Sequence, residues 1–398
     1  MNPMQSTAGR THPTPNGYLA FHPNPLPPHP EFVLDAEGVL ALTDAEFQLG
    51  KLAQVAATIP NPDLFAGMYL RREAILSSEI ENISSTLDEV LQYEAEDEHS
   101  DGSTDIAQVV NYVRAFREGA KRLEQEKLTA SLLKDLHGIL LHGDEDALPG
   151  RYREKQNWIG RKGANEINAD FVPPPQQVML ELLMNLDYFI NEYQSPLAPL
   201  VSCALAHAQF ETIHPFKDGN GRIGRLLIAL MLCKTKKLER PLLFLSLYFL
   251  NNRSEYYERL MNVRSKGDWL GWVKFMLLGI QITAQEAVAM ADKLIALQDE
   301  MQHATQDLPR AGALLKVLYQ YPIITSAGAE KHLKVARDTA IDWLKRFEKL
   351  KIVRETTAQK RGRIYRFDRY IEILDDGWSA RKTAAAKKIA ESTPITQS

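Results

Sequence analysis

The chain has 398 residues, enough for two or three domains, and its 44% hydrophobic and 25% charged residues are typical of a globular protein. The net charge of −4 conceals an acidic body and a basic C-terminal part, residues 309–398, which suggests separate roles. No secretory signal precedes residue 36 and the longest apolar run near the central motif is too short to cross a bilayer, so we expect a cytoplasmic protein with no membrane partner.

The N-terminal segment is rich in proline. Eight of the 21 prolines fall within residues 1–30, and proline lacks the amide hydrogen that a helix needs. We therefore expect residues 1–35 to form an extended arm. Residues 36–103 follow as a helical segment, in which apolar residues recur at three- and four-residue steps and predict a helix over 64–93. The acidic stretch 94–102 is predicted to be a solvated loop.

Helical periodicity dominates the largest block, residues 104–305. Two short β-like runs, 158–160 and 169–172, interrupt it and predict a small hairpin that the triple proline after Val172 ends, because proline cannot continue a paired ladder. The helices predicted within this block lie at about 105–126, 128–142, 176–193, 199–213, 221–236, 252–263 and 268–302.

Residues 309–376 are predicted to form a winged-helix domain. Three helical patterns are followed by two short strands around the turn 359–362, which is the order of elements in winged helices. The predicted helices are 311–321, 325–333 and 336–350, and the strands are 352–354 and 363–367. Residues 377–398 are polar and rich in Lys and Ala, so we expect a basic flexible tail.

The basic C-terminal domain raises a DNA-binding regulator as one hypothesis. A dimerisation or target-docking module with a solvated basic face is the alternative, and we favour it. Binding to duplex DNA that weakens steeply with salt would distinguish the two. The residues that would meet DNA phosphates are Lys331, Lys334, Arg337, Lys345, Arg346, Lys349, Lys360, Arg361 and Arg363.

The segment from Ile213 to Arg225 carries residues suited to phosphate chemistry. Gly219 and Gly221 permit backbone geometries that point several amides in one direction at the start of a helix. Together with the positive end of the helix dipole, these amides form a nest for phosphate oxygens. Asp218 adds a hard oxygen ligand at the mouth of the nest, which suits Mg²⁺.

Three further side chains complete this segment. Arg222 and Arg225 are three residues apart and share a helix face, so both guanidinium groups can neutralise phosphate charge. His214 lies just upstream, and its ordinary pKa near 6.5 suits a general base. In-line phosphoryl chemistry requires a general base, a metal ligand, an anion-binding nest and cations that neutralise phosphate charge, and this segment offers all four.

Glycines at positions 219, 221 and 224 also fit the dinucleotide-binding fingerprint. That fingerprint follows an apolar strand, whereas the approach here, 211–218, is polar and interrupted by a proline. The chain also contains no Gly-x-x-x-x-Gly-Lys-Ser/Thr sequence. We therefore exclude a nicotinamide-cofactor site and a P-loop.

The segment His-Pro-Phe-Lys-Asp-Gly-Asn-Gly-Arg-Ile-Gly-Arg, residues 214–225, resembles the Fic-family signature His-Pro-Phe-x-Asp-Gly-Asn-Gly-Arg-x-x-Arg at every fixed position. The resemblance implies a mainly α fold, with a helical core, a β-hairpin flap and a C-terminal winged helix. It also implies a protein adenylyltransferase that moves AMP from Mg-ATP to Tyr, Thr or Ser hydroxyls, including its own. Doc-type kinases of this fold carry Lys where this chain has Gly221, so adenylylation is favoured over phosphorylation.

A second resemblance involves Ser77-Ser78-Glu79-Ile80-Glu81-Asn82, which is similar to the family's inhibitory motif Ser/Thr-x-x-x-Glu-Gly/Asn. It implies an inhibitory helix in which Ser77, Glu81 and Asn82 are the motif residues. Glu81 is then expected to pair with Arg225 and occupy the place of the ATP γ-phosphate.

The resemblance also assigns roles along the site. His214 would deprotonate the target hydroxyl, Asp218 would hold Mg²⁺, and the hairpin would present the target protein by main-chain pairing. Asn251 would touch the adenosine end, with Tyr248 and Tyr257 near the base. The implied nucleotide-binding set is Glu81, His214, Gly219, Asn220, Gly221, Arg222, Ile223, Gly224, Arg225 and Asn251.

Some alternatives stay open at this point. Removal of AMP from proteins, or another nucleotidyl or phosphoryl transfer, is compatible with the same residues. A homodimer is compatible with the sequence, and neither the target protein nor the auto-modified residue follows from it.

Overall fold

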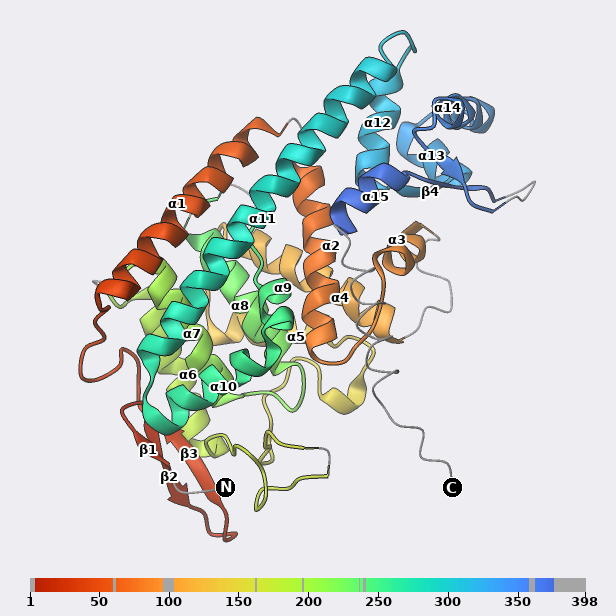
Figure 1. Ribbon diagram of the computed structural model, residues 1–398. Helices are drawn as coiled ribbons and strands as arrows, with labels where there is room; N and C mark the ends of the chain where they lie inside the picture. Colours follow the sequence, from red (N-terminus) through yellow and green to blue (C-terminus); the bar gives the residue numbers. More distant parts are fainter. Residues whose placement is uncertain are drawn as a thin grey trace, which may run out of the picture. The chain divides into compact units, whose positions relative to one another are not determined.

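A computed structural model of the chain is mainly α-helical (Figure 1). It describes residues 4–59, 62–95, 104–161, 163–194, 197–235, 237–238, 241–357 and 362–375. The tail predicted at 377–398, most of the acidic loop and most of the turn at 359–362 lie outside the described residues. Within the described ranges, no helix combines the length and apolarity needed to span a bilayer.

The chain divides into two compact units, and each is built from three stretches of sequence. The first comprises residues 1–57, 76–83 and 107–288, and the second comprises 58–75, 84–106 and the residues from 289 onward. These units do not follow the predicted blocks, because three long helices each contribute to both: α2 (Pro62–Ile80), α4 (Thr104–Arg122) and α11 (Trp269–Ala304).

The N-terminal segment is a small antiparallel sheet, not the extended arm expected for 1–35. Strands β1 (Gln5–Ser6), β2 (Gly9–Pro13) and β3 (Leu19–Pro23) pair in the order β1-β2-β3, with Thr11 opposite Phe21. Proline composition suggested an arm, but Pro13 and Pro23 occupy strand ends, where a missing amide disturbs the ladder least.

Two buried helices of the first unit, α7 (Pro199–Ile213) and α8 (Asn220–Lys234), pack against each other (Figure 1). Both are apolar around most of their circumference, which is the pattern of a helix buried in a core. The others are α1 (Ala36–Thr58), α5 (Ala130–Leu140), α6 (Gln176–Asn191), α9 (Ser246–Asn251) and α10 (Arg253–Lys266), with a short 3-10 turn at Glu145–Ala147.

The predicted hairpin at 157–172 contains one backbone bridge, between Ile159 and Phe171. The Ile159 amide donates to the Phe171 carbonyl at 2.8 Å and the reverse bond is 3.0 Å. Strand β3 lies beside the outgoing side, because the Phe21 amide donates to the Val172 carbonyl at 2.9 Å. The rings of Phe21 and Phe171 lie 5.7 Å apart. The N-terminal sheet therefore supports the hairpin.

The helix predicted over 64–93 is two helices, α2 and α3 (Leu87–Ala95). Asn82 ends the first with a positive φ of 64°, a conformation that Asn tolerates better than most residues. Thr86 and Glu89 then cap α3 reciprocally: the Glu89 amide donates to the Thr86 hydroxyl at 3.2 Å, and the Thr86 amide donates to the Glu89 carboxylate at 2.7 Å.

In the second unit, three helices and a hairpin appear in the predicted order. They are α12 (Ala311–Gln320), α13 (Ser326–Leu333), α14 (Arg337–Lys349), β5 (Arg354–Glu355) and β6 (Ile364–Arg366). A strand that the sequence did not indicate, β4 (Ile323–Thr325), pairs with β6, and α15 (Asp368–Asp375) follows the sheet. The winged-helix assignment itself stays a prediction.

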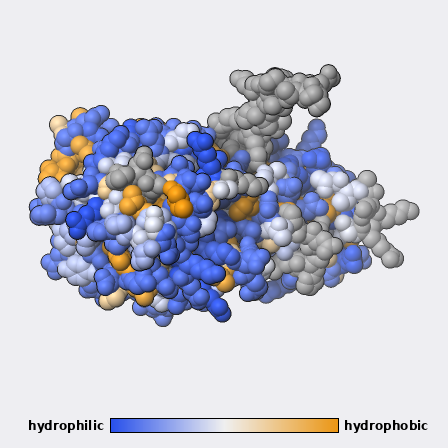
Figure 2. Space-filling model, turned by 90° about the horizontal axis from the view of Figure 1, so that it is seen from below, coloured by the Kyte–Doolittle hydropathy of each residue, from blue (hydrophilic) through white to orange (hydrophobic). Residues whose placement is uncertain are grey.

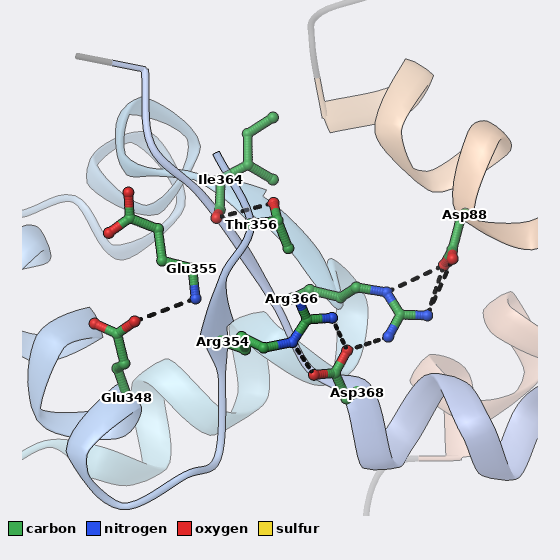
Figure 3. A network of polar contacts seen from close by, with 8 residues as sticks. All are labelled: Asp88, Glu348, Arg354, Glu355, Thr356, Ile364, Arg366 and Asp368. Carbon is green, nitrogen blue, oxygen red and sulfur yellow. Dashed lines mark hydrogen bonds and ion pairs between the residues drawn. The ribbon is translucent and has the colours of Figure 1, made fainter. Parts of the chain in front are cut away.

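Helix α3 is joined to this sheet by charged side chains (Figure 3). Arg366 of β6 donates to the Asp88 carboxylate at 2.9 and 3.1 Å and also pairs with Asp368. Arg354 donates to Asp368 at 2.7 and 3.0 Å. Asp88, in the first turn of α3, is thus bound to the C-terminal sheet.

Candidate active site

His214 ends helix α7 in a left-handed conformation, with φ 50° and ψ 60°. Its amide donates a hydrogen bond to the Phe210 carbonyl at 2.9 Å, the last one of the helix. A residue other than Gly or Asn in this region carries strain, which surrounding contacts must hold. Pro215 follows, and the chain turns here toward the loop before α8.

Two residues that the sequence did not single out hold this turn. Arg153 donates from Nε to the His214 carbonyl at 3.0 Å, and its own amide donates to the Pro215 carbonyl at 3.0 Å. Asn157 donates from Nδ2 to the carbonyls of His214 and Phe216 at 3.3 and 2.9 Å. These contacts join positions about 60 residues apart in sequence, so no local sequence pattern predicts them.

The imidazole of His214 is neutral at physiological pH. Burial and, after it, the nearby cations Arg264 and Arg153 lower its pKa to about 3. A backbone hydrogen bond to Glu211 acts to raise the pKa, but burial and the two arginines outweigh it. The ring therefore has a nitrogen lone pair available to accept a proton, as a general base must.

The loop before α8 is shaped by Asn220. Its carboxamide accepts from the Phe216 amide at 2.9 Å and donates to the Phe216 carbonyl at 2.8 Å. Gly219 takes the N-cap position with a φ of 75°, and no side chain caps the helix. The amides of the first helical turn, Asn220 to Arg222, have no carbonyl one turn earlier to pair with. They lie where the anion nest was predicted, and phosphate binding by them stays a prediction.

Asp218 lies exposed at the mouth of this nest, and its Oδ1 accepts from the Gly219 amide at 2.6 Å. His137, which the sequence analysis did not identify, lies beneath it. The His137 Nδ1 accepts from the Gly150 amide at 3.0 Å, so Nε2 carries the hydrogen and donates to the Asp218 carbonyl at 3.0 Å. The ring also stacks on Phe216 with centroids 3.9 Å apart.

The described residues include no cluster of three or more His, Cys, Asp or Glu side chains that could hold a metal by themselves. A single exposed carboxylate beside an anion nest nevertheless fits Mg²⁺, which binds proteins through one or two carboxylates and takes its other ligands from phosphates and water. Asp218 is the residue that fits.

The two motif arginines are almost fully buried, at 2% exposure for Arg222 and 3% for Arg225. Arg222 donates to the Gln108 carboxamide at 2.5 Å. Arg225 donates from Nε to the Ser77 hydroxyl and from Nη2 to the Ser77 carbonyl, both at 2.8 Å. Both predicted positions therefore point their guanidinium groups into the protein.

Arg225 also pairs with Glu81, whose Oε1 accepts from Nη2 at 2.8 Å. Burial opposes the charge of Arg225, but Glu81 outweighs it and holds the pKa of the guanidinium above its ordinary value. A Cβ added at Gly221 would lie 2.2 Å from the Glu81 Oε1. The Glu81 carboxylate thus lies against the first turn of α8, on the nest itself.

Beneath Arg225 is a buried polar layer. His207, fully buried as a packing histidine should be, has its ring nitrogens 3.0 Å from the Gly224 carbonyl and 2.9 Å from the Tyr256 hydroxyl. A Cβ at Gly224 would lie 2.1 Å from the Glu211 Oε1, so any larger residue there would require the Glu211 side chain to move. Burial raises the pKa of Glu211 to about 7.

The predicted adenosine residues divide between two places. Asn251 and Tyr248 line a cavity of about 750 Å³ with Glu37 of α1, and no residue of 214–225 lines it. Tyr257 lies near Arg253, whose guanidinium donates to the Ile80 carbonyl at 2.7 Å. An adenosine contact by Asn251 stays a prediction.

The chain matches the Fic/DOC family N-terminal domain over residues 39–121 and the Fic/DOC family domain over 127–232. The second match ends within α8 and contains the whole 214–225 segment. The chain thus contains a Fic/DOC N-terminal domain and a Fic/DOC domain. The sequence-based recognition is therefore confirmed.

Among Fic/DOC relatives, protein adenylyltransferase fic-1 of Caenorhabditis elegans is 29% identical over 154 residues, 38% of this chain and 27% of that protein. A probable protein adenylyltransferase of Aquifex aeolicus is 28% identical over 170 residues, 41% of this chain and 48% of that protein. This Fic/DOC chain thus matches less than half the length of either relative.

The fold of the Fic/DOC chain is shared with a solved structure. The crystal structure of a Fic family protein from Desulfovibrio desulfuricans G20 aligns with a TM-score of 0.54 and 22% identity, covering 84% of this chain and 97% of that one. The mainly helical Fic fold expected from the sequence is confirmed.

Proposed function

We propose that this Fic/DOC protein is an adenylyltransferase that moves AMP from ATP to a Tyr, Thr or Ser hydroxyl of a protein, itself included. The observation that carries the proposal is the placement of a neutral His214 beside an uncapped helix N-terminus that begins with Gly219. One relative is named a protein adenylyltransferase and the other a probable protein adenylyltransferase, which supports the transfer of AMP to a protein.

The reaction can be followed through the chain's own residues. His214 accepts the proton of the target hydroxyl, whose oxygen then bonds to the α-phosphorus of ATP. The bond from that phosphorus to the bridging oxygen breaks, and diphosphate leaves with the electron pair. The amides of Asn220, Gly221 and Arg222 stabilise the charge that develops on the phosphate oxygens. Mg²⁺ held at Asp218 would neutralise further phosphate charge.

The same geometry supports autoinhibition. Glu81 occupies the Nη2 atom of Arg225 and the space against Gly221. An ATP γ-phosphate that needs Arg225 must displace this carboxylate, so Glu81 and the terminal phosphate compete for one cation.

The DNA-binding alternative is supported less well by the C-terminal unit. Several arginines there are already paired with carboxylates: Arg346 with Asp342 at 2.8 Å, Arg363 with Glu355 at 3.4 Å and Arg354 with Asp368 at 2.7 Å. Paired arginines offer less net positive charge to phosphates.

Mass spectrometry of the purified chain after incubation with Mg-ATP tests the proposal. Glu81→Gly is expected to gain the mass of one AMP, more than the parent does, and His214→Ala is expected to gain none. His142→Ala, an exposed histidine outside the site, is the matched control and should label like the parent. A gain of one phosphate would indicate phosphoryl transfer, and labelling of His214→Ala would contradict the proposed mechanism.

A further inference from the structure

Arg264, in the last turn of α10, belongs to neither the signature nor the inhibitory motif, yet it is only 4% exposed. Its Nη2 donates to the Glu211 carbonyl at 2.9 Å, and its Nε donates to the Thr212 hydroxyl at 3.2 Å. Both acceptors lie in the last turn of α7, directly before His214. A side chain of α10 therefore holds the end of the helix that leads to the proposed base.

The end of α7 needs such partners, because the last carbonyls of an α-helix have no amide one turn later to pair with. Arg264 donates to the Glu211 carbonyl, and Arg153 donates to the His214 carbonyl. Positive charge near the C-terminal end of a helix is also favoured by the helix dipole. Two buried arginines thus hold the chain immediately before His214 and at His214 itself.

The ring of Phe171, in the hairpin, lies against the Arg264 guanidinium. The Arg264 Cζ atom is 4.0 Å from the centre of the Phe171 ring, within the range of a cation–π contact. Phe171 is fully buried and lies beside Phe21 of β3. Figure 2 views the molecule from the side of the β1–β3 sheet and shows a mostly hydrophilic surface with separate small apolar patches, as expected where rings such as Phe21 are buried. The position of the guanidinium therefore depends on the hairpin.

The backbone of Arg264 is in contact with the N-terminal sheet. Its carbonyl accepts from the Ser6 hydroxyl of β1 at 2.9 Å. Gly267 ends α10 with a φ of 70°, and a Cβ added there would lie 2.2 Å from the Thr7 hydroxyl oxygen, so the sheet packs closely against this end of the helix. Arg264 is thus held at its backbone by the sheet and at its guanidinium by α7 and the hairpin.

The Glu211 carbonyl connects Arg264 to the imidazole of His214. It accepts from the Arg264 guanidinium, and a hydrogen bond from the His214 ring to the same backbone acts to raise the pKa of His214. An imidazole that donates to a carbonyl through one nitrogen is held in one tautomer, which leaves the other nitrogen free to accept a proton. Whatever keeps this carbonyl in place therefore also keeps the ring ready to act as a base.

We propose that Arg264 is a positioning residue for the base: held by Phe171 and β1, it fixes the backbone at the end of α7 and, through it, the orientation and tautomer of the His214 ring. The proposal rests on the proposed function, and it deepens that function by linking the base to the hairpin. Arg264 acts through the backbone of α7 and not on the nucleotide, so its loss should change how well the base works and not how well ATP binds.

The state of the ring can be measured by NMR without any AMP transfer. The full-length protein is labelled with ¹⁵N in its histidines, and the His214 signals are identified by their absence from His214→Ala. We expect one neutral tautomer in the parent, with one protonated and one unprotonated ring nitrogen, and an exchanging mixture of tautomers in Arg264→Met. Arg122→Met is the matched control, because it also removes an arginine that joins two helices, α4 and α5, and it should keep the parent's signals. Unchanged His214 signals in Arg264→Met would overturn the proposal.

Self-labelling with ATP in the Glu81→Gly background is the second test. A misplaced base slows the transfer step, so we expect the maximal rate of Arg264→Met to fall about 10- to 100-fold. The ATP concentration that gives half the maximal rate should stay within about twofold, because the contacts to the nucleotide are unchanged. Arg264→Lys keeps the charge without the planar guanidinium and should recover part of the rate. If Arg264 only stabilised the fold, the rate would fall only with the folded fraction, which circular dichroism measures, and that outcome would contradict the proposal.

A double-mutant cycle tests the link to the hairpin. Phe171→Leu removes the ring but keeps an apolar side chain, and it should slow self-labelling by about three- to tenfold. In Arg264→Met the same change should have almost no further effect, because Phe171 acts through the guanidinium. Phe189→Leu, which alters a buried ring of α6 beside Tyr193, is the matched control and should leave the rate unchanged in both backgrounds. Independent effects of Phe171→Leu and Arg264→Met would refute the link.

The NMR measurement separates this proposal from the proposed function. If the parent transfers no AMP but Arg264→Met disturbs the His214 tautomer, the adenylyltransferase is refuted and the hold of Arg264 on the ring stands. If the parent transfers AMP and Arg264→Met changes neither the tautomer nor the maximal rate, the positioning role of Arg264 alone is refuted.

Discussion

Two regions of this chain join an arginine to carboxylates, and they do so in opposite surroundings. Arg225 has a side chain that is 2% exposed and pairs with Glu81, which is 33% exposed. Arg366 of the C-terminal unit is 17% exposed and pairs with Asp88, which is 54% exposed (Figure 3). If Asp88 moves away from Arg366, water can take its place as a hydrogen-bond partner, whereas little water reaches Arg225.

The difference in burial determines which pair can act as a switch. A buried guanidinium needs an anion at all times, so whatever displaces Glu81 must itself be anionic, as a γ-phosphate is. A solvent-exposed pair contributes about 0–1 kcal/mol and its loss changes little beyond local order. We therefore propose that the buried pair couples to ligand binding, whereas the exposed network fastens α3 to its sheet.

The largest expected effect concerns activity. Glu81→Gly frees Arg225 for the γ-phosphate, and a hydrogen bond to a charged group is worth about 1.5–3 kcal/mol, or roughly 10- to 100-fold in labelling rate. Asp88→Ala, which breaks the exposed pair, is expected to change the rate by no more than about twofold. Initial rates with α-labelled ATP compare the two variants. An equal increase in both would show that burial is not what distinguishes the pairs.

The second expected effect concerns pH, because the pKa values of the carboxylates in the two regions are shifted in opposite directions. Burial raises the pKa of Glu211, beside Arg225, from its ordinary 4.5 to about 7. The folded chain keeps that proton between these values and the unfolded chain releases it, so the contribution of Glu211 to stability is complete below about pH 4.5 and is lost as pH rises through 7. The loss is about 3 kcal/mol.

Glu211→Gln removes this dependence, so its stability relative to the parent is expected to rise between pH 5 and pH 8. Asp368→Asn is the control from the exposed network. Burial acts to raise the pKa of Asp368, but Arg354 and Arg366 outweigh it and hold the pKa below its ordinary 3.8. Its contribution is therefore lost only on acidification through that low pKa, and the difference from the parent should be flat from pH 5 to 8. Melting temperatures of the parent and both variants at pH 5 and pH 8 measure these differences. If the difference between Glu211→Gln and the parent is the same at both pH values, the raised pKa of Glu211 is contradicted.

A third, smaller effect concerns the charge left behind at Arg225. Glu81→Gly leaves the guanidinium with Ser77 as its partner, so we expect a loss of about 1–2 kcal/mol in the free energy of unfolding, reduced by the partial exposure of Glu81. Mg-ATP should stabilise this variant more than the parent, because ligand bound to the folded state adds to its stability. Equal shifts in melting temperature with Mg-ATP would argue against competition at Arg225.

Helix α7 and the motif that follows it could be predicted from the sequence because their signals are local. The predicted bounds, 199–213, are those observed, since a proline begins the helix and His-Pro ends it. The structure also brings Glu81 to Arg225, as the family resemblance implied.

The supporting residues could not be predicted, because their contacts are distant in sequence. Arg153, Asn157 and His137 bond to carbonyls between Ile213 and Asp218, and no spacing rule connects those positions. The break between α2 and α3 did have a local signal, the Thr86–Glu89 capping box, which the apolar periodicity obscured. The N-terminal sheet depends on pairing between strands whose prolines suggested no pairing at all.

The smallest expected effect belongs to the exposed network. Asp88→Asn removes the charge that Arg366 binds but keeps a hydrogen-bond acceptor, and Asp88 is more than half exposed, so the free energy of unfolding should fall by less than about 1 kcal/mol. The difference should shrink further at 1 M salt, where the screening length is about 3 Å. Urea unfolding of the full-length variant at low and high salt measures both. A loss of stability as large as that of Glu81→Gly, or one that persists at high salt, would contradict this expectation. In that case α3 would depend on Arg366 as strongly as the active site depends on Arg225, and burial would not distinguish the two ion pairs.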